Sequence, residues 1–378
     1  MAIRREEDLE GFDDLSEEEM VLNMGPQHPS THGVLRLVLK TDGEVIRDVI
    51  PHIGYLHRAL EKIAERVTYN QFMPYTDRLD YVAAMNSNLA WAVTVEKLLN
   101  VEIPPRATYL RVIMCELNRI ASHLVFLGTF SLDVGSITPF MFAFRDREKI
   151  LDLFEMASGA RLTYNYIKIG GVWQDIPEGW VDKCYEFLKF FQPKLKDYDR
   201  LLTDNKIFIQ RTAKVGILPQ EVALAYSVTG PNLRATGISW DIRKEEPYCD
   251  YDKFDFEVPV GTVGDSWDRF YVRVQEMRQS CKIIRQALDH LPEGPVMGRL
   301  PKVPRPKAGE VYMRTEAPRG EMGMFLISDG STKPYRVKIR TGSFTALSAL
   351  PEIVRGWMVA DLVAIFGSLD VVLPEVDR

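Results

Sequence analysis

The middle of the chain carries apolar residues at the three- and four-residue spacing of amphipathic helices. The clearest case is "ATYLRVIMCELNRIASHLVFLG" at 107–128, whose leucines, isoleucines and methionine recur along one face. Similar patterns predict helices over 77–100, 138–159 and 265–291. Four long helices in one chain are typical of a helical bundle.

Alternating apolar and polar positions predict strands towards both ends of the chain. The segment 34–50, "VLRLVLKTDGEVIRDVI", alternates and then turns at Asp-Gly, which predicts a β-hairpin. The segments 309–330 and 334–344 alternate in the same way, and 348–370 returns to a helical pattern. We therefore expect an α+β fold, a central helical bundle with small β-sheets near the N-terminus and in the C-terminal third.

These patterns divide the chain into four regions. An acidic extension covers 1–19, a β-hairpin region 20–54 and the helical bundle core 55–290. The last region, 291–378, contains a proline-rich connector, a small β region and a C-terminal helix and tail. A chain of 378 residues is long for one hydrophobic core, so two or three sub-regions sharing one compact body are expected.

Composition and charge exclude several functional classes. The net charge of -6 gives no basic surface for nucleic acid. No run approaches the roughly eighteen apolar residues of a membrane-spanning helix, and the acidic N-terminus resembles no secretory or transit leader. The cysteines stand singly, without a Cys-x-x-Cys pair, which argues against a disulfide framework, a thiolate zinc site or an iron–sulfur cluster: Cys115, Cys184, Cys249 and Cys281.

A loop at 23–33, "NMGPQHPSTHG", concentrates candidate chemistry. His28 and His32 stand four apart, the spacing of two metal ligands on one helix face. The two prolines and the closing glycine make a helix here unlikely, so we expect a stiff loop. A metal site recruiting His52 and His57 is disfavoured, because no carboxylate or cysteine accompanies the histidines at ligand spacing.

A dense series of motifs resembles one known family. The segments are "GPQHPSTHGVLRL", "PHIGYLHRALEKIAE", "YTDRLDYVAAMN", "PPRATYLRVIMCELNRIASHLVFLG", "TPFMFAFRDRE", "GGVWQDIP" and "SLDVVLPEVDR". From about residue 20 to the last residue they resemble, in the same order, the hydrogenase-like large subunit of NADH-quinone oxidoreductase, respiratory complex I (the D subunit, also called the 49-kilodalton subunit). One departure is the connector near 291–310, which is shorter than usual in the family.

The resemblance implies a fold like the large subunit of nickel–iron hydrogenases, without the metal. In complex I the vacated cavity receives a quinone headgroup at the contact with a smaller iron–sulfur subunit. The lack of paired cysteines agrees with this, because a nickel–iron centre needs soft thiolate ligands. The chain would hold no cofactor alone, quinone being the substrate and the iron–sulfur cluster belonging to the neighbour. The implied partners are that small iron–sulfur protein (the B subunit), the C subunit and the membrane-embedded H subunit of complex I.

By resemblance, His32 and Tyr81 are the two hydrogen-bonding partners of the headgroup. His28 would either flank the headgroup or brace the loop. Histidine and tyrosine suit a reaction that consumes protons. Asp133 would pair with His32, orienting the imidazole and favouring its protonated form. From the residues alone, Tyr81 could equally be a core tyrosine on a helix, His32 a cap of the hairpin and Asp133 a turn residue.

Two further residues are placed by resemblance near the neighbour's iron–sulfur cluster, namely Arg58 and His123. On the helix 107–128, His123 also lies on one narrow polar strip with Glu116 and Arg119, since these residues are three and four apart. The rest of this helix is too apolar for a surface helix. We therefore expect these polar groups to be buried and mutually paired.

The expected function is that of a peripheral-arm subunit of a proton-translocating NADH-quinone oxidoreductase. It would lie at the cytoplasmic or equivalent side of the energy-converting membrane. Two alternatives stay open, the same role in a ferredoxin- or F420-driven relative, and a scaffold subunit without catalysis. The sequence identifies neither the quinone nor the electron donor.

Overall fold

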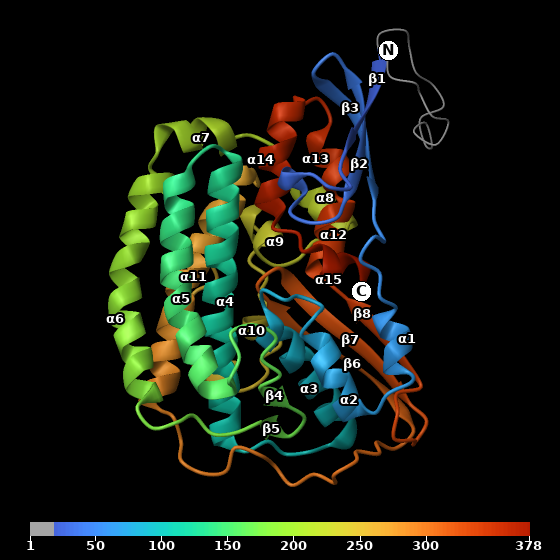
Figure 1. Cartoon of the computed structure of the whole chain (residues 1–378), viewed down its shortest axis with the longest axis vertical. Helices are drawn as coiled ribbons and strands as arrows, with labels where there is room; N and C mark the ends of the chain where they lie inside the picture. Colours follow the sequence, from blue (N-terminus) through green and yellow to red (C-terminus); the bar gives the residue numbers. More distant parts are fainter. Residues whose placement is uncertain (1–18) are drawn as a thin grey trace.

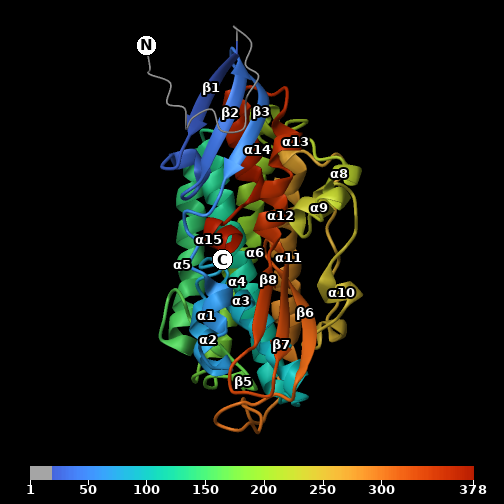
Figure 2. The same cartoon turned by 90° about the vertical axis from the view of Figure 1, so that its right-hand side faces the viewer.

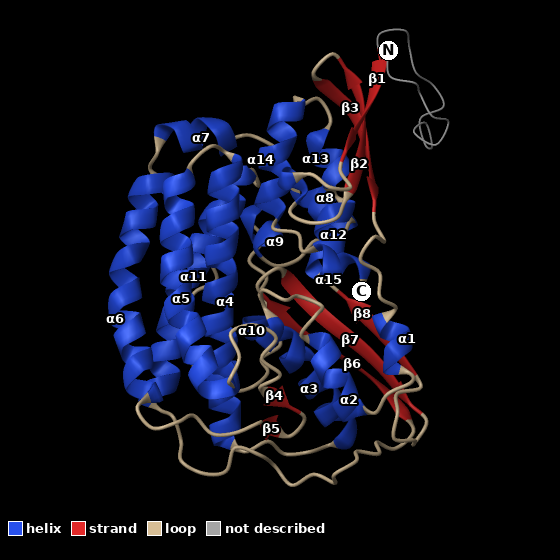
Figure 3. Cartoon of the chain, in the orientation of Figure 1, coloured by secondary structure: helices blue, strands red, loops and turns tan. Residues whose placement is uncertain are grey.

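The structure, a computed structural model, describes residues 19–378. Four long helices lie side by side: α4 (Pro105–Asp133), α5 (Ile137–Ser158), α6 (Trp180–Tyr198) and α11 (Ser266–Asp289). Two separate β-sheets stand on the other side of the molecule (Figures 1 and 3). The predicted α+β class with a central bundle is confirmed, whereas nearly all of the predicted acidic extension lies outside the described residues.

The N-terminal sheet contains three antiparallel strands, β1 (Glu19–Met24), β2 (Arg36–Asp42) and β3 (Val45–His52). β2 and β3 form the predicted hairpin. β1, which the sequence pattern did not predict, pairs with residues 37–42 of β2. The loop at 23–33, called the histidine loop from here on, therefore connects two paired strands, so both of its ends are fixed.

The C-terminal sheet is formed by β6 (Gly309–Ala317), β7 (Gly320–Ser328) and β8 (Arg336–Arg340), again antiparallel and in sequence order. Helix α3 (Ala84–Leu99) packs on β6 and β7. A two-stranded ribbon of β4 (Ile167–Lys168) and β5 (Gly171–Val172) follows the bundle helix α5. The shorter helices are α1 (Leu60–Ala64), α2 (Tyr69–Thr76), α7 (Lys206–Thr212), α8 (Gln220–Ala225), α9 (Pro231–Ala235), α10 (Ile242–Glu245), α12 (Gly342–Ser348), α13 (Leu350–Val354), α14 (Val359–Leu369) and α15 (Leu373–Asp377).

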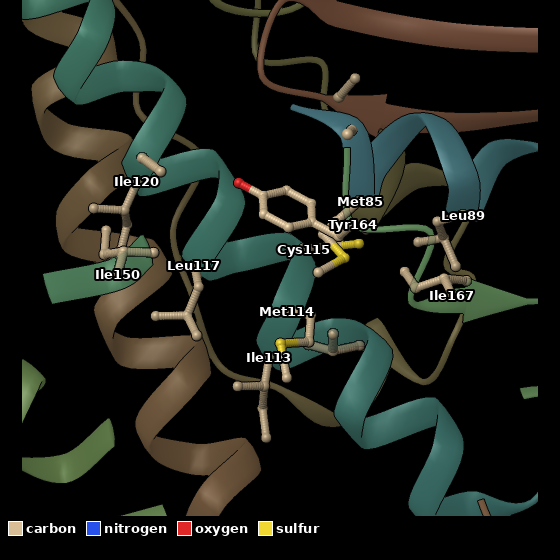
Figure 4. Close-up of a cluster of buried hydrophobic side chains, with 14 of the residues drawn as sticks. Met85, Leu89, Ile113, Met114, Cys115, Leu117, Ile120, Ile150, Tyr164 and Ile167 are labelled. Atoms are coloured by element: carbon tan, nitrogen blue, oxygen red, sulfur yellow. The ribbon is translucent and has the colours of Figure 1, made fainter. Parts of the chain in front are cut away.

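The main hydrophobic core surrounds α4, which is buried along nearly its whole length. Figure 4 shows part of this core, with Met85 and Leu89 of α3 on one side of α4 and Ile150 of α5 on the other. A second apolar cluster joins the N-terminal sheet to α12, α13 and α14. No helix of the described part is long and apolar enough to cross a membrane.

Three of the four predicted bundle helices agree closely with the structure. The fourth, predicted over 77–100, begins late and packs on the C-terminal sheet as α3, whereas α6, which the pattern did not predict, completes the bundle. Helix α3 starts at Ala84, because the preceding residues form a turn. The carboxylate of Asp80 accepts hydrogen bonds from the amides of Val82 (3.1 Å) and Ala83 (3.3 Å). An aspartate that satisfies nearby backbone amides competes with the helix, which explains the late start.

The predicted helix 348–370 is interrupted between α13 and α14. Gly356, whose φ is +81°, donates its amide to the carbonyl of Ile46 (2.8 Å), and the amide of Ile46 donates to the carbonyl of Trp357 (2.8 Å). Pairing with β3 thus replaces the helical bonds at this point. It also fixes the position at which α14 starts.

The polar strip of α4 is buried and paired, as predicted. Glu116 accepts hydrogen bonds from Arg119 (3.2 Å) and from the Tyr251 hydroxyl (2.7 Å), and it forms an ion pair with Arg243 (3.1 Å). Burial opposes the charge, but the guanidinium groups of Arg119 and Arg243 hold the pKa of Glu116 below its usual range. Charged partners therefore replace the water that this carboxylate loses.

We expect the buried Arg234 to be essential for stability. Its guanidinium pairs with Glu276 (2.6 Å) and Glu316 (2.8 Å), and all three side chains are almost completely buried. Arg234→Met would leave both carboxylates without this cation, so we expect a loss of about 3–5 kcal/mol in the free energy of unfolding. Urea unfolding measures it, with the surface variant Arg161→Met as control. Equal stability of the two variants would contradict the prediction.

Candidate functional site

The histidine loop is held by its own hydrogen bonds. Its centre is a short 3-10 turn, Pro29–Thr31, whose end is His32 in the left-handed conformation (φ 51°). The Nδ1 atom of His28 accepts the amide of Ser30 (3.2 Å), and the amide of His32 donates to the carbonyl of Pro29 (3.3 Å). The loop forms no α-helix, as predicted, and these hydrogen bonds fix the direction of the His32 side chain.

The structure brings His32 and Asp133 together. Nε2 of His32 lies 2.7 Å from Oδ2 of Asp133, the last residue of α4. The imidazole is 20% exposed, so one face stays open to a ligand while the carboxylate side is largely covered. Helix α14 covers this pair from behind: a Cβ at Gly367 would lie 2.7 Å from Oδ2 of Asp133. A side chain at position 367 would therefore displace that carboxylate from its position beside His32.

Tyr81 lies in the turn before α3 and is 40% exposed, so its interpretation as a core tyrosine on a helix is wrong. Partial burial raises the pKa of the Tyr81 phenol. The charge of Arg319 lowers this pKa, and the charges of Asp80 and Asp370 raise it. The phenol therefore stays protonated at neutral pH and is a hydrogen-bond donor there. It shares its surroundings with a buried cluster of charged groups.

That cluster is centred on Arg319, in the turn between β6 and β7. Its guanidinium contacts Oδ2 of Asp80 (2.6 Å), Oδ1 of Asp370 (3.2 Å) and the hydroxyl of Ser122 on α4 (3.1 Å). The partners come from three distant parts of the sequence. Sequence reasoning missed Arg319, and the only local signal is an arginine at the Pro-Arg-Gly turn of "EAPRGEMG".

The C-terminal segment, residues 366–375, contacts both halves of the site. Gly367 packs against Asp133, and Asp370 pairs with Arg319 beside Tyr81. A Cβ at Gly33, the residue after His32, would lie 3.0 Å from Cδ1 of Leu373. Figure 2 shows the end of the chain beside α15 and α1, about halfway along the molecule. Among the described residues no hydrogen bond or ion pair joins Tyr81 directly to His32.

His28 lies on another side of the loop. It lines a largely apolar groove of about 730 Å³ between β1 and α14, together with residues such as Leu22 and Val363. Its ring nitrogen is used to brace the loop. The structure does not bring it into contact with Asp133.

Arg58 and His123 lie in different surroundings. The Arg58 guanidinium donates to the carbonyls of Leu56 (2.7 Å), Arg78 (3.0 Å) and Pro374 (3.3 Å), and burial lowers its pKa. It thereby ties the segment before α1 to the C-terminal segment.

His123 is completely buried, with Nε2 2.8 Å from Oε2 of Glu276. Burial lowers the pKa of this imidazole, although Glu276 raises it. Its Nδ1 has no hydrogen-bond partner, which fits a neutral ring that donates its Nε2 proton to Glu276. The placement near a neighbour's cluster stays a prediction for both residues.

Within residues 19–378 no group of three or more histidine, cysteine or carboxylate side chains is arranged to hold a metal ion. The four cysteines are free thiols. His57, one of the histidines that a metal site could have recruited, instead contacts the carbonyl of Asp377 (2.7 Å) through its Nδ1.

Comparison with known proteins places the chain in one family. The family described as "Respiratory-chain NADH dehydrogenase, 49 Kd subunit" matches residues 133–308 and 301–378. The NADH-quinone oxidoreductase D subunit 2 of Anaeromyxobacter dehalogenans is 54% identical over 370 residues, which cover 97% of this chain and 98% of that protein. The D subunit of Desulforamulus reducens is 54% identical over 95% of this chain and 98% of its own length.

The D subunit of Bacillus cereus is 52% identical over 361 residues, covering 95% of this chain and 99% of that protein. Identity of this extent spans the histidine loop, the bundle and the C-terminal segment alike. The chain belongs to the family of the 49-kilodalton subunit of respiratory-chain NADH dehydrogenase, the D subunit of NADH-quinone oxidoreductase.

Proposed function

We propose that this chain forms the headgroup site for a quinone together with a neighbouring iron–sulfur subunit. His32 and Tyr81 would each donate a hydrogen bond to one of the two quinone oxygens. The observation that carries the proposal is that both donors are partly exposed beside one buried C-terminal segment: the ring of His32 lies edge-on to that of Phe366, and the phenol of Tyr81 lies within electrostatic reach of Asp370. The two electrons would come from outside the chain.

Reduction of a quinone to a quinol consumes two electrons and two protons, so each oxygen needs a donor that can give up a proton. Histidine suits this task because its ring can hold and give up a proton, and Asp133, 2.7 Å from Nε2 of His32, orients the imidazole. Tyr81 suits the second oxygen, because its phenol holds its proton at neutral pH. The stiff loop places His32 before the substrate arrives, which reduces the entropy lost on binding.

A second polypeptide would close the site. Next to Asp133, the apolar side chains of Leu132, Ile137 and Met141 are all exposed, and Tyr81 is partly so. A planar quinone headgroup binds best in a concave site that excludes water, and the exposed face beside Asp133 lacks one wall. Contiguous exposed apolar residues mark protein interfaces. We assign the missing wall to the small iron–sulfur protein, the B subunit, with the C subunit and the membrane-embedded H subunit as further partners.

At the level of the assembly, we propose a proton-translocating complex whose peripheral arm contains this chain on the cytoplasmic or equivalent side of the membrane. A ferredoxin- or F420-driven relative would use the same quinone site with another electron-input subunit. A scaffold subunit would need neither His32 nor Tyr81. Purification of the native complex and identification of its subunits tests this part, because a flavin-bearing NADH subunit distinguishes the donors.

The Tyr81→Phe variant tests the headgroup site. Phenylalanine keeps the ring but removes the donor, so we expect assembly to be retained and quinone reduction to fall, by about 1–3 kcal/mol of lost stabilisation for an unpaired oxygen. That corresponds to roughly 5- to 150-fold in rate. The measurement is NADH:quinone activity of the assembled complex. Tyr335→Phe, an exposed tyrosine outside the site, is the control, and normal activity of Tyr81→Phe would refute the proposal.

A double-mutant cycle tests the pairing of His32 with Asp133. We expect Asp133→Asn and His32→Ala each to slow quinone reduction, because the first removes the charge that supports the imidazole and the second removes the donor. If both act through one proton, the double variant should be no slower than His32→Ala alone. Rates of the three variants in assembled enzyme decide the matter. Multiplicative losses would show that the two residues work independently.

A redox titration tests the predicted influence of His123 on the neighbour's cluster. The lowered pKa of His123 leaves it unprotonated at neutral pH and able to take up a proton when negative charge arrives nearby. The midpoint potential of the cluster should then vary with pH, and this slope should flatten in His123→Met, since a thioether does not titrate. An unchanged slope would assign the coupled proton to another group.

A further inference from the structure

A compact group of buried charges lies beside Tyr81 and has no role in binding the headgroup as proposed. It contains three carboxyl groups and two guanidinium groups, all less than one-tenth exposed: Asp80, Asp370, Glu375, Arg273 and Arg319. The two arginines meet at Asp370, where Arg319 lies 3.2 Å from Oδ1 and Arg273 lies 3.6 Å from Oδ2. Arg319 also holds Asp80.

The charges in this group do not balance if every member is ionised. Two cations then face three anions in a region with little water, and an unpaired buried carboxylate is costly. Asp80 and Asp370 each contact a guanidinium, whereas within the described chain no ion pair reaches Glu375. The group is neutral when one of its carboxyls carries a proton.

Glu375 lies on α15, and its carboxyl accepts a hydrogen bond from the hydroxyl of Ser343 on α12. The charged groups that face it are Asp80 from the turn before α3, Arg319 from the β6–β7 turn and Asp370 from the end of α14. The other charged side chains of α15 and of the residue after it form hydrogen bonds with other groups. Asp377 accepts the amides of Gly54 and Leu56, and the Arg378 guanidinium donates to the carbonyl of Ile339.

Burial and the neighbouring carboxylates act in the same direction on this residue. Burial first, and then the charge of Asp80, raise the pKa of Glu375 to about 8, against the opposing effects of Arg319 and Ser343. Burial and Asp370 also raise the pKa of Asp80. Neighbouring carboxyl groups that cannot both ionise hold a proton between them, so the titration belongs to the pair.

We propose that Asp80 and Glu375 share one stored proton and return it to Tyr81 after the phenol has protonated the quinone. This inference rests on the proposed function of Tyr81. In the first step the phenol O–H bond breaks and an O–H bond forms on the reduced quinone oxygen. In the second the carboxyl O–H bond breaks and the phenol O–H bond re-forms, which leaves the pair with one more negative charge until water supplies a proton.

The surroundings of Tyr81 favour such a transfer. Asp80 directly precedes Tyr81 in the chain, and the phenol lies within electrostatic reach of Arg319, Asp80 and Asp370. The cation of Arg319 stabilises the phenolate while it exists, and its contact with Asp80 keeps that carboxyl in place. Neither Asp80 nor Glu375 needs to touch the substrate, because both act through Tyr81.

The test is the pH dependence of quinone reduction in the assembled complex. With the native chain the rate should fall as pH rises through about 8, since the stored proton is then lost. In Glu375→Gln that decline should disappear. The rate at pH 7 should be lower by on the order of tenfold, less than the 10²–10⁴-fold typical of losing a direct proton donor.

Ser343→Ala gives a second, opposite prediction. Its hydroxyl stabilises the ionised form of Glu375, so its removal should move the decline to higher pH while the rate at pH 7 is maintained. Glu352→Gln, the same substitution on the exposed surface of α13, should leave the profile unchanged. A decline near pH 8 that persists in Glu375→Gln overturns the proposal, even if the rate has dropped, because a merely structural role would produce that result.

Infrared spectroscopy of the native complex provides a measurement that does not depend on assembly of the variants. A protonated-carboxyl C=O band should be present at pH 7 and lost as pH rises through about 8, and its absence at pH 7 overturns the proposal. The Tyr81→Phe variant distinguishes failure of the proposed function from failure of the stored-proton proposal. Full activity of Tyr81→Phe removes the proposed function itself, whereas a slow Tyr81→Phe with an unaltered Glu375→Gln profile removes only the stored proton.

Discussion

The buried contact between Arg319 and Asp370 fixes the C-terminal segment, and the geometry of the candidate site depends on that segment. Arg319 also contacts Asp80 and Ser122, so one guanidinium joins the turn before α3, the middle of α4 and the end of α14. A buried cation with two carboxylate partners allows little displacement of any of them, because a lost contact leaves an unpaired charge without water. The positions of Tyr81 and Asp133 are thus determined together, although they lie on different elements.

Helix α4 transmits the same constraint along the molecule. Its apolar faces pack in the main core, while its polar strip forms ion pairs that tolerate no shift in register. Buried ion pairs contribute little net stability compared with apolar packing, but they discriminate between alternative arrangements. Glu116 and His123 therefore fix the rotation and height of α4. Asp133, at its last turn, reaches His32 only when both are correct.

The sequence predicted what local patterns determine and missed what distant contacts determine. Helices α4, α5 and α11 follow from apolar spacing and the β2–β3 hairpin from an Asp-Gly turn, whereas α6 was not predicted. The start of α3 did not follow from the apolar pattern, because the hydrogen bonds that Asp80 accepts within its own turn compete with helix formation. Family resemblance predicted the contact between His32 and Asp133. The link between Asp80 and Arg319 joins residues 239 positions apart, and no spacing rule predicts such a pair.

On the proposed function, this architecture separates proton chemistry from electron chemistry. The described chain supplies groups that hold, orient and exchange protons, and its apolar face beside Asp133 remains open for a partner that brings the electrons. Such a division requires rigidity, because donors that moved when the partner docked would lose their alignment with the substrate. The left-handed His32 and the glycine at 367 are tolerated for this reason. His32 costs backbone strain and the helical glycine costs chain entropy, and each fixes one side of the contact between imidazole and carboxylate.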